Sequence, residues 1–257
     1  MKIISWNVNS VRARINYINE LLQTEKPDFL CLQETKIIDN EFPNKNFTEL
    51  GYFSYFFGIP SYNGVAILSK KKIINIEKID LCNKLDARII LGETSGFDIM
   101  SVYVPAGGDT PDPNINHKFK HKLLFLDELN QLLKTRKKII VCGDLNVAPH
   151  EDDVWSHKSL INVVSHTEIE REKLKKILED CNFIDAVRYF INPPQNIYTW
   201  WSYRSPNYKI NNRGRRLDHI WVSKQIKNKL VSSKILDKYR SKDKPSDHVP
   251  VCLEMKN

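Results

Sequence analysis

Short apolar runs of four to seven residues are the feature that most limits how this 257-residue chain folds. Several of the runs are apolar at every position, which is typical of strands covered on both faces rather than strands with one face in water. We therefore expect strands at Lys2–Trp6, Asp28–Leu32, Gly64–Leu68, Arg88–Leu91, Asp98–Val104, Lys138–Cys142, Tyr198–Trp201, Leu217–Val222 and Val249–Leu253. A sheet covered on both faces needs other elements packed against it, so the pattern favours an α/β architecture with the sheet at the centre and helices outside.

Apolar residues at helical spacing lie between the strands and predict three helices. They are Val11, Ile15, Ile18 and Leu22 in the first stripe, Leu123, Leu126, Leu129, Leu132 and Leu133 in the second, and Leu174, Ile177 and Leu178 in the third. Ser10 is a possible N-cap of the first helix, and Thr167 with Glu170 forms a capping-box pattern before the third. No linker rich in proline, glycine or serine divides the chain, so we expect a single domain spanning residues 1–257.

The chain is basic, with 39 Lys and Arg residues against 31 Asp and Glu residues and a formal net charge of +8. This charge fits a polyanionic partner, although many basic proteins bind none. The five cysteines form no CxxC pair, and an odd count without a secretion signal is typical of a reducing compartment. No stretch approaches the roughly 20 apolar residues that span a bilayer, so we expect a cytoplasmic protein with no membrane association.

Polar side chains stand at or beside the ends of five of the apolar runs. They are Asn7, Glu34, Asp144 with Asn146, Asp218, and Asp247 with His248. Each of them alone has an ordinary interpretation as a cap, a turn or a solvated strand end. Together they indicate a functional site, because loops at strand ends on a rigid sheet are where binding and catalytic residues concentrate.

The residue types at these positions limit the chemistry of such a site. Carboxylates and amides are hard oxygen ligands, which suit Mg²⁺ and are poor ligands for zinc. The sequence contains no HExxH motif and no cysteine cluster. An oxygen-lined site with one His–Asp pair suits the attack of water on a phosphoryl group, since a metal offsets charge on the phosphate oxygens and a base prepares the water.

Eight stretches of the chain are similar, in order, to the exonuclease III class of apurinic/apyrimidinic endonucleases within the endonuclease/exonuclease/phosphatase superfamily. The stretches are ISWNVNSVRAR (4–14), LCLQETK (30–36), YNGVAILSK (62–70), VYVP (102–105), VCGDLNVAP (141–149), YTWWSYR (198–204), RRLDHIWVS (215–223) and PSDHVPV (245–251). The resemblance runs from one end of the chain to the other. It implies a two-sheet α/β sandwich with helices on the outside, as in deoxyribonuclease I.

The resemblance also implies a set of metal ligands. Glu34 would be the principal ligand of Mg²⁺, with Asn7 beside it and Asp247 nearby. The wider set of candidate ligands adds Asp144, Asn146 and His248. Mn²⁺ is expected to substitute for Mg²⁺.

The expected catalytic residues follow from the same resemblance. Asp144 would position or activate the attacking water, and Asn146 would hold a phosphate oxygen. His248 would contact the scissile phosphate and would be oriented by Asp218. Tyr103 would bind the phosphate or help the leaving oxygen depart. The sequence leaves open whether Asp144 or His248 takes the proton of the water.

An aromatic stretch is expected to form the substrate pocket. In the family, the residue that matches Trp200 lines a pocket for the flipped-out abasic sugar, and Leu217 matches a second wall. Extrusion costs least where the base is already missing. Either Trp200 or Trp201 is expected to pack in the core instead. Basic residues placed to follow the DNA backbone are Lys36, Arg12, Arg204, Arg213 and Arg216, and a solvated surface charge is an equal alternative for each.

The chain departs from the family pattern at two positions that bear on substrate preference. Many relatives carry Asn or Gln after Tyr-x-Pro to help hold phosphate, whereas this chain has Ala106 followed by Gly107 and Gly108. Backbone N–H groups would then take over that contact. Relatives often have Trp or Leu where this chain has Arg215. Its stem either packs as the third wall of the sugar pocket, with the guanidinium on a phosphate, or leaves the pocket open on one side.

The function implied is that of a monomeric DNA repair nuclease acting on double-stranded DNA with abasic sites or blocked 3′ ends. It would hydrolyse phosphodiester bonds 5′ to abasic sites with Mg²⁺, with 3′–5′ exonuclease and 3′-phosphatase or 3′-phosphodiesterase activities. One alternative is another phosphodiesterase of the same fold, acting on RNA, inositol phosphates or phospholipids. Another is a non-catalytic DNA-binding module, which would be expected to have lost at least one of the catalytic residues.

Overall fold

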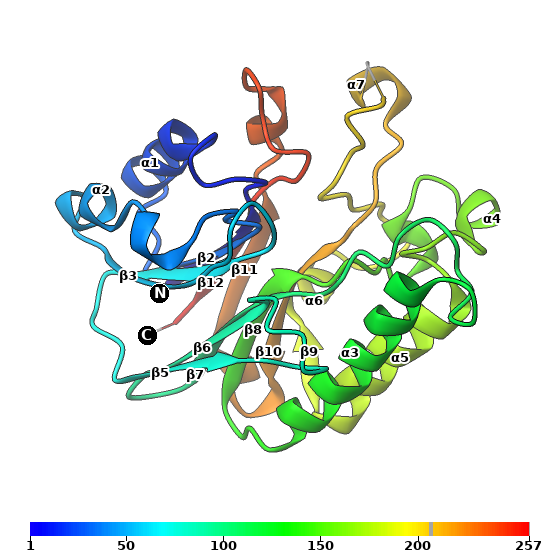
Figure 1. The fold of residues 1–257 in the computed structure, drawn as a ribbon, viewed down its shortest axis with the longest axis horizontal. Helices are drawn as coiled ribbons and strands as arrows, with labels where there is room; N and C mark the ends of the chain where they lie inside the picture. The colour runs from blue at the N-terminus through cyan, green and yellow to red at the C-terminus, as the bar shows by residue number, and fades with distance from the viewer. Residues whose placement is uncertain (206–207, 257) are drawn as a thin grey trace.

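The computed structural model describes residues 1–205 and 208–256, and it is built around two stacked six-stranded sheets (Figure 1). The strands of the first sheet, in spatial order, are β11 (Leu230–Ile235), β12 (Val251–Met255), β1 (Lys2–Asn7), β2 (Phe29–Gln33), β4 (Val65–Ser69) and β3 (Phe53–Phe57). Those of the second are β5 (Asn75–Ile79), β6 (Ile89–Glu93), β7 (Asp98–Tyr103), β8 (Ile139–Asp144), β10 (Asp218–Ser223) and β9 (Phe183–Asp185). The expected two-sheet α/β sandwich is confirmed.

The inner faces of the two sheets pack against each other and form one apolar core. Ile3 and Ile67 of the first sheet belong to the same buried cluster as Ile99, Ile140 and Ile220 of the second. Because side chains alternate across a strand, the residues between them face outward. Helices cover those outer faces, which is why the runs are apolar at every position.

Helices cover each sheet on its outer side, as Figure 1 shows. The outward residues of the first sheet pack against α1 (Ile15–Thr24) and α2 (Asn44–Glu49). Those of the second sheet pack against α3 (His117–Lys134) and α5 (Glu168–Asp180). The shorter helices are α4 (His157–Leu160), α6 (Ala186–Phe190) and α7 (Tyr208–Asn211). Among the described residues, no helix has the length and apolar character needed to cross a bilayer.

Strand predictions succeeded at the centre of each sheet and failed at its edges. The four strands that the apolar runs did not reveal are β3, β5, β9 and β11, and each is the outermost strand of its sheet. Edge strands are less buried, and most residues of β5 and β11 are exposed or half-buried. Without two covered faces they carry no continuous apolar run.

The predicted strand Tyr198–Trp201 was wrong. This segment forms only single bridges, from Trp200 to Arg215 and to His248. Its apolar and aromatic side chains are used instead in packing and in the wall of a cavity, as described below. Such a use cannot be distinguished from a short strand by pattern alone.

The helix starts were predicted with mixed success. Ser10 is not the N-cap of α1, because Arg14 occupies that position without a side-chain hydrogen bond, and Val11 is buried ahead of the helix. The capping box before α5 is confirmed, since Thr167 and Glu170 bond each other's backbone in both directions.

Strands β1 and β8 occupy equivalent positions in the two sheets. Each lies third from an edge, with an antiparallel neighbour (β12 or β10) on one side and a parallel neighbour (β2 or β7) on the other. β1 ends at Asn7 and β8 ends at Asp144. Because those two side chains hydrogen-bond to each other, the two strands end at the same end of the sandwich.

Candidate active site

Polar residues from both sheets meet at this end of the sandwich. Asn7 ends β1, Glu34 follows β2, and Asp144 ends β8. Asp218 begins β10 and lies directly opposite Asp144 in the antiparallel register. His248 comes from the loop before β12, and its carbonyl accepts a hydrogen bond from the indole of Trp6 at 3.2 Å.

Asn7 lies at the centre of the cluster. Its Nδ2 donates to Glu34 Oε1 and to Asp144 Oδ2, both at 2.8 Å, and lies 3.4 Å from His248 Nε2. Its Oδ1 accepts a hydrogen bond from the backbone N–H of Asn9 at 3.0 Å. The amide oxygen of Asn7 therefore faces away from the carboxylates, and the amide nitrogen bridges them.

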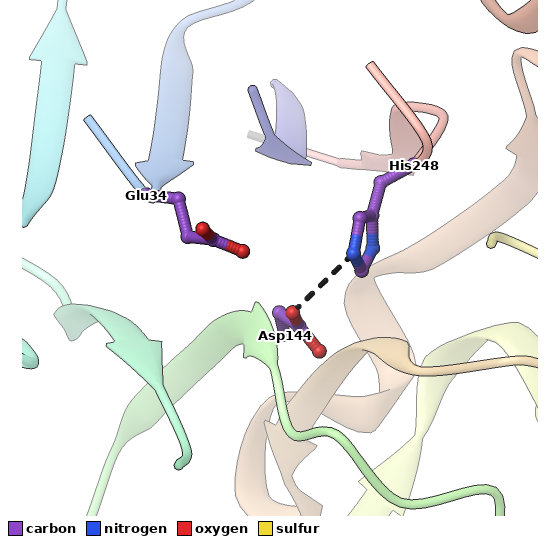
Figure 2. Close-up of side chains that lie close together, drawn as sticks. All are labelled: Glu34, Asp144 and His248. Carbon is purple, nitrogen blue, oxygen red and sulfur yellow. Dashed lines mark ion pairs between the residues drawn. The ribbon is translucent and has the colours of Figure 1, made fainter. Parts of the chain in front are cut away.

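Glu34, Asp144 and His248 form a three-residue group with the geometry of a metal site (Figure 2). Each offers one ligand atom, and these atoms lie within 4.8 Å of one another. His248 Nε2 is 3.6 Å from Asp144 Oδ2. Two carboxylates and one imidazole suit a divalent cation that favours oxygen ligands.

Asp218 orients the imidazole of His248. Its Oδ2 lies 2.8 Å from His248 Nδ1, and the two side chains are almost completely buried. The backbone N–H of Asp218 donates to Thr199 Oγ1 at 3.1 Å, which holds the start of β10 in place. The other carboxylate oxygen of Asp218 has no hydrogen-bond partner among the described residues. With a proton on Nδ1 facing Asp218, Nε2 of His248 is presented to Asp144 and Asn7.

Burial and close charges shift the protonation of this cluster. Burial acts to lower the pKa of His248, but the carboxylates of Asp218 and Asp144 outweigh it and raise the pKa to about 10. Burial raises the pKa of Asp144 to about 7; the positive charge of His248 opposes this rise, and the negative charge of Asp218 adds to it. A bound divalent cation would favour the deprotonated form of each ligand.

Tyr103 and Asn146 flank the cluster. Burial, followed by the negative charges of Glu34 and Asp144, raises the pKa of Tyr103 well above its usual range, so its hydroxyl keeps its proton. The backbone N–H of Asn146 donates to Asp144 Oδ1 at 2.9 Å, and its Nδ2 donates to the carbonyl of Val104 at 2.8 Å. Asn146 thus fixes the orientation of the Asp144 carboxylate through its backbone N–H.

Several site residues have a left-handed backbone. The φ angles are +50° at Glu34, +53° at Lys36 and +53° at Asn146. Such angles are costly for residues other than glycine and concentrate at functional sites. Here they turn polar side chains toward the cluster directly after a buried strand.

A cavity of about 790 Å³ opens beside the cluster. Its lining includes the predicted residues Glu34, Tyr103, Asp144, Asn146, Trp200, Arg204, Arg215, Leu217, Asp247 and His248, together with Arg213. Trp200 lies on its wall and Trp201 is buried, as expected for one tryptophan in the core. Asn7 and Asp218 lie behind the lining and act on it through Asp144 and His248.

Two predicted residues occupy places that their sequence positions did not reveal. The carboxylate of Asp247 accepts hydrogen bonds from Asn9 Nδ2 at 3.1 Å and Trp200 Nε1 at 2.9 Å, and it is not part of the three-residue group. Lys36 forms an ion pair with Glu34, with 2.8 Å between Nζ and Oε2. Asp247 therefore fixes a cavity wall, and Lys36 neutralises a carboxylate of the cluster.

Arg215 closes one side of the cavity. Its Nη1 donates to the carbonyl of Val164 at 3.0 Å and to Ser165 Oγ at 2.6 Å. Its guanidinium carbon lies 5.5 Å from the ring centroid of Trp200, within the range of a cation–π contact. The side chain is thus held as a wall beside Trp200.

Arg216 was expected either to follow the DNA backbone or to be a solvated surface charge, and both expectations were wrong. It is completely buried and forms ion pairs with Asp153 and Asp185 at 2.8 Å and 2.7 Å. Consecutive residues of an extended segment point in opposite directions, so Arg215 faces the cavity and Arg216 faces the interior.

Sequence reasoning missed several residues that hold the site together. Asn9 contacts both Lys36 and Asp247, and Thr199 accepts hydrogen bonds from the backbone of Leu217 and Asp218. These contacts join segments that are distant in the sequence. Asn9 lies in the first motif of the family resemblance, but nothing in its neighbourhood indicated its partners.

Two covered six-stranded sheets with a carboxylate and imidazole site at one end define a hydrolase of the deoxyribonuclease I-like fold. The chain belongs to the endonuclease/exonuclease/phosphatase family, whose sequence pattern matches residues 4–248. This family consists of metal-dependent enzymes, in agreement with the cluster of Glu34, Asp144 and His248.

Named relatives of the chain are DNA nucleases. It is 31% identical to exodeoxyribonuclease III of Haemophilus influenzae, over 100% of both chains. It is 34% identical to an AP endonuclease from Archaeoglobus fulgidus, whose structure matches with a TM-score of 0.93 over 100% of both chains. A 3′ phosphatase, NExo, from Neisseria bound to a product DNA hairpin also matches with a TM-score of 0.93, at 29% identity over 100% of both chains.

Proposed function

We propose that this chain is a Mg²⁺-dependent DNA repair nuclease that cleaves duplex DNA 5′ to abasic sites and removes blocking groups from 3′ ends. One observation carries the proposal: Glu34, Asp144 and His248 line a cavity walled by Trp200, and Asp218 holds the imidazole of His248 from behind that lining. The activities named for relatives, an AP endonuclease and a 3′ phosphatase, support the same substrates. We further propose that it acts in the cytoplasm as a monomer, from a single domain spanning residues 1–257.

The donor set fits the proposed metal. Glu34, Asp144 and His248 would hold one divalent cation, since their ligand atoms lie within 4.8 Å of one another. Asn7 would join them only after its amide turns, because its nitrogen now faces the carboxylates. The bound cation would offset negative charge on the phosphate oxygens. Mg²⁺, with Mn²⁺ as a substitute, suits this oxygen-rich site better than zinc.

The protein residues divide the remaining work. Asp218 keeps Nε2 of His248 directed at the cluster, where it would bind the cation or, while protonated and not bound to the cation, donate to a phosphate oxygen. Asp144 would be deprotonated with the cation bound and would then accept a proton from the attacking water. Tyr103 keeps its proton and donates to the phosphate. Asn146 keeps the carboxylate of Asp144 oriented.

The cavity accounts for the proposed preference for DNA that lacks a base. Trp200 and Leu217 offer apolar faces, and Arg215 closes the third side, so the space suits a deoxyribose without its base. Arg204 and Arg213 add positive charge for the phosphates that flank the sugar. The intact catalytic cluster argues against a non-catalytic DNA-binding module.

The test uses a duplex with a single tetrahydrofuran abasic analogue, beside an undamaged blunt duplex and a duplex with a 3′ phosphate. Incision 5′ to the analogue and release of phosphate are expected with Mg²⁺, and neither is expected in EDTA. Cleavage of the undamaged duplex alone would overturn the abasic assignment. At the Mg²⁺ concentration that suffices for the wild type, Glu34→Ala should slow both reactions strongly, and the matched control is Glu172→Ala, an exposed carboxylate on α5.

A further inference from the structure

A second cavity opens at the end of the sandwich opposite the catalytic cluster, and we call it the distal cavity. Its volume is about 410 Å³, within the range of roughly 300–1,000 Å³ that is usual for ligand sites. Its lining includes Met1 before β1 and Phe29 at the start of β2, and the label N in Figure 1 marks this end. The six residues of β1, at about 3.3 Å each, separate it from the cluster by about 17 Å. An occupant here would therefore leave the catalytic cavity free for DNA.

The floor of the distal cavity is apolar. It is the place where the core between the two sheets reaches the surface, and it is formed by Phe29, Ile73, Ile226 and Met255 with the half-buried Phe97. Ile74 lies at the edge of the cavity and is 67% exposed. A bulky apolar side chain placed on this floor would remove Ile74 and Phe97 from water, which is favourable.

The rim of the distal cavity is positively charged. It carries four exposed lysines, Lys71, Lys72, Lys229 and Lys256. No Asp or Glu among the described residues lines the cavity. The neighbouring Lys70 forms an ion pair with Asp28 at 3.9 Å, whereas no carboxylate in the described part of the chain pairs with any of the four. Their uncompensated charge attracts anionic groups.

The four lysines form two pairs at opposite ends of the cavity. Lys71 and Lys72 follow β4. Lys229 precedes β11 and Lys256 follows β12, and the backbone N–H of Lys256 donates to the carbonyl of Lys229 at 2.7 Å. β12 and β4 are three strand spacings apart, which is about 14 Å at about 4.8 Å for each spacing. An extended peptide covers this distance in about four residues, at about 3.3 Å each.

We infer that the distal cavity docks an acidic segment of a partner protein, with a bulky apolar side chain on the floor and carboxylates on both lysine pairs. An apolar anchor inside a polar rim is the usual arrangement of a strong protein contact. A fatty acid has one carboxylate and would meet only one lysine pair. Single-stranded nucleic acid binds by stacking bases on open aromatic faces, whereas Phe29 is buried and packs edge-on against Phe97, with 5.8 Å between ring centroids. The inference is independent of the proposed function, because the two cavities share no residue.

The test uses the peptide DDFIDD, with blocked ends and a fluorescein label, in anisotropy titrations of the full chain. Saturable binding is expected below about 1 mM peptide at low salt. Lys72→Glu together with Lys229→Glu, one change at each lysine pair, should weaken binding at least tenfold. The matched control is Lys45→Glu together with Lys224→Glu, which alters the net charge equally at two exposed lysines outside the cavity. Thermal denaturation establishes that both double variants are folded.

Two further peptides separate the apolar and the charged contributions. DDSSDD lacks the apolar anchor and NNFINN lacks the charges, so each should bind at least tenfold more weakly than DDFIDD. Wild-type protein without saturable binding would overturn the inference, and so would equal losses of affinity in the two double variants or equal affinity for the three peptides. Displacement of DDFIDD by lower concentrations of laurate or of a single-stranded oligonucleotide would assign the cavity to lipid or nucleic acid instead. Incision of the abasic duplex should stay within about twofold of wild type in both double variants, and a loss confined to Lys72→Glu with Lys229→Glu would mark a DNA-binding surface and overturn the inference.

Discussion

The pairing of His248 with Asp218 makes a sharp kinetic prediction. The two residues are held at 2.8 Å between Nδ1 and Oδ2, and both are almost completely buried. Without Asp218, nothing holds the proton on Nδ1, and Nε2 no longer faces the cluster in a fixed protonation state. We expect His248→Ala, Asp218→Ala and the double variant to lose similar amounts of kcat/KM.

The magnitude follows from the role of the pair. Positioned acid or base groups contribute roughly 10²–10⁴-fold to rate. A loss of about 10³-fold corresponds to about 4 kcal/mol, at about 1.4 kcal/mol for each factor of ten. If the residues act as one unit, the double variant also loses about 10³-fold, whereas independent residues would lose about 10⁶-fold. The coupling free energy is then about 4 kcal/mol.

The assay is steady-state incision of the abasic duplex at saturating Mg²⁺, with thermal denaturation of each variant. A matched control is His219→Gln. His219 is buried like His248 and follows Asp218 on β10, but it contacts Arg216 and the carbonyl of Val147 instead of the cluster. Its folded fraction should retain most of the activity. Single losses that multiply in the double variant would refute the pairing.

Four further predictions concern metal, pH, substrate and salt. Glu34→Ala should raise the Mg²⁺ concentration needed for half-maximal incision at least tenfold without lowering Tm in EDTA, and an unchanged metal requirement would contradict its role as a ligand. In EDTA, the free energy of unfolding should fall as pH rises from about 6.5 to 10. Folding raises the pKa of His248 to about 10, so the stabilisation from its protonated form is complete below about pH 6.5 and is lost as pH rises toward 10. His248→Ala should flatten this slope in denaturation curves. Trp200→Ala should reduce abasic incision at least tenfold more than 3′–5′ digestion. Arg215→Leu should weaken DNA binding and keep the abasic preference. If Arg215→Leu instead suppresses digestion of undamaged ends at unchanged DNA affinity, the pocket is open on the side of Arg215. DNA affinity should fall steeply between about 50 and 200 mM salt in anisotropy titrations, and a flat response would exclude a phosphate-tracking groove.

The sequence by itself determined the central strands and the chemistry at their ends. Runs such as Lys138–Cys142 are apolar on both faces because helices and a second sheet cover them, so each buried position carries an apolar residue that the sequence shows. Asp144 and Asn146 stand where such a run ends, so their position at the end of a central strand followed directly. The edge strands β3 and β11 have no continuous apolar run, because solvent reaches one side of them.

Only the tertiary structure decided which side chains meet. Arg215 and Arg216 are adjacent and chemically identical, yet one closes the cavity and the other is buried with Asp153 and Asp185. Lys122 reads as one more residue of a helix, and its contact with Glu170, 48 positions away, depends on how α3 and α5 pack over the second sheet. Local pattern reports how buried a position is, whereas partners are set by the packing of distant elements. For that reason the ligand types of the site followed from the sequence and the hydrogen bonds that orient them did not.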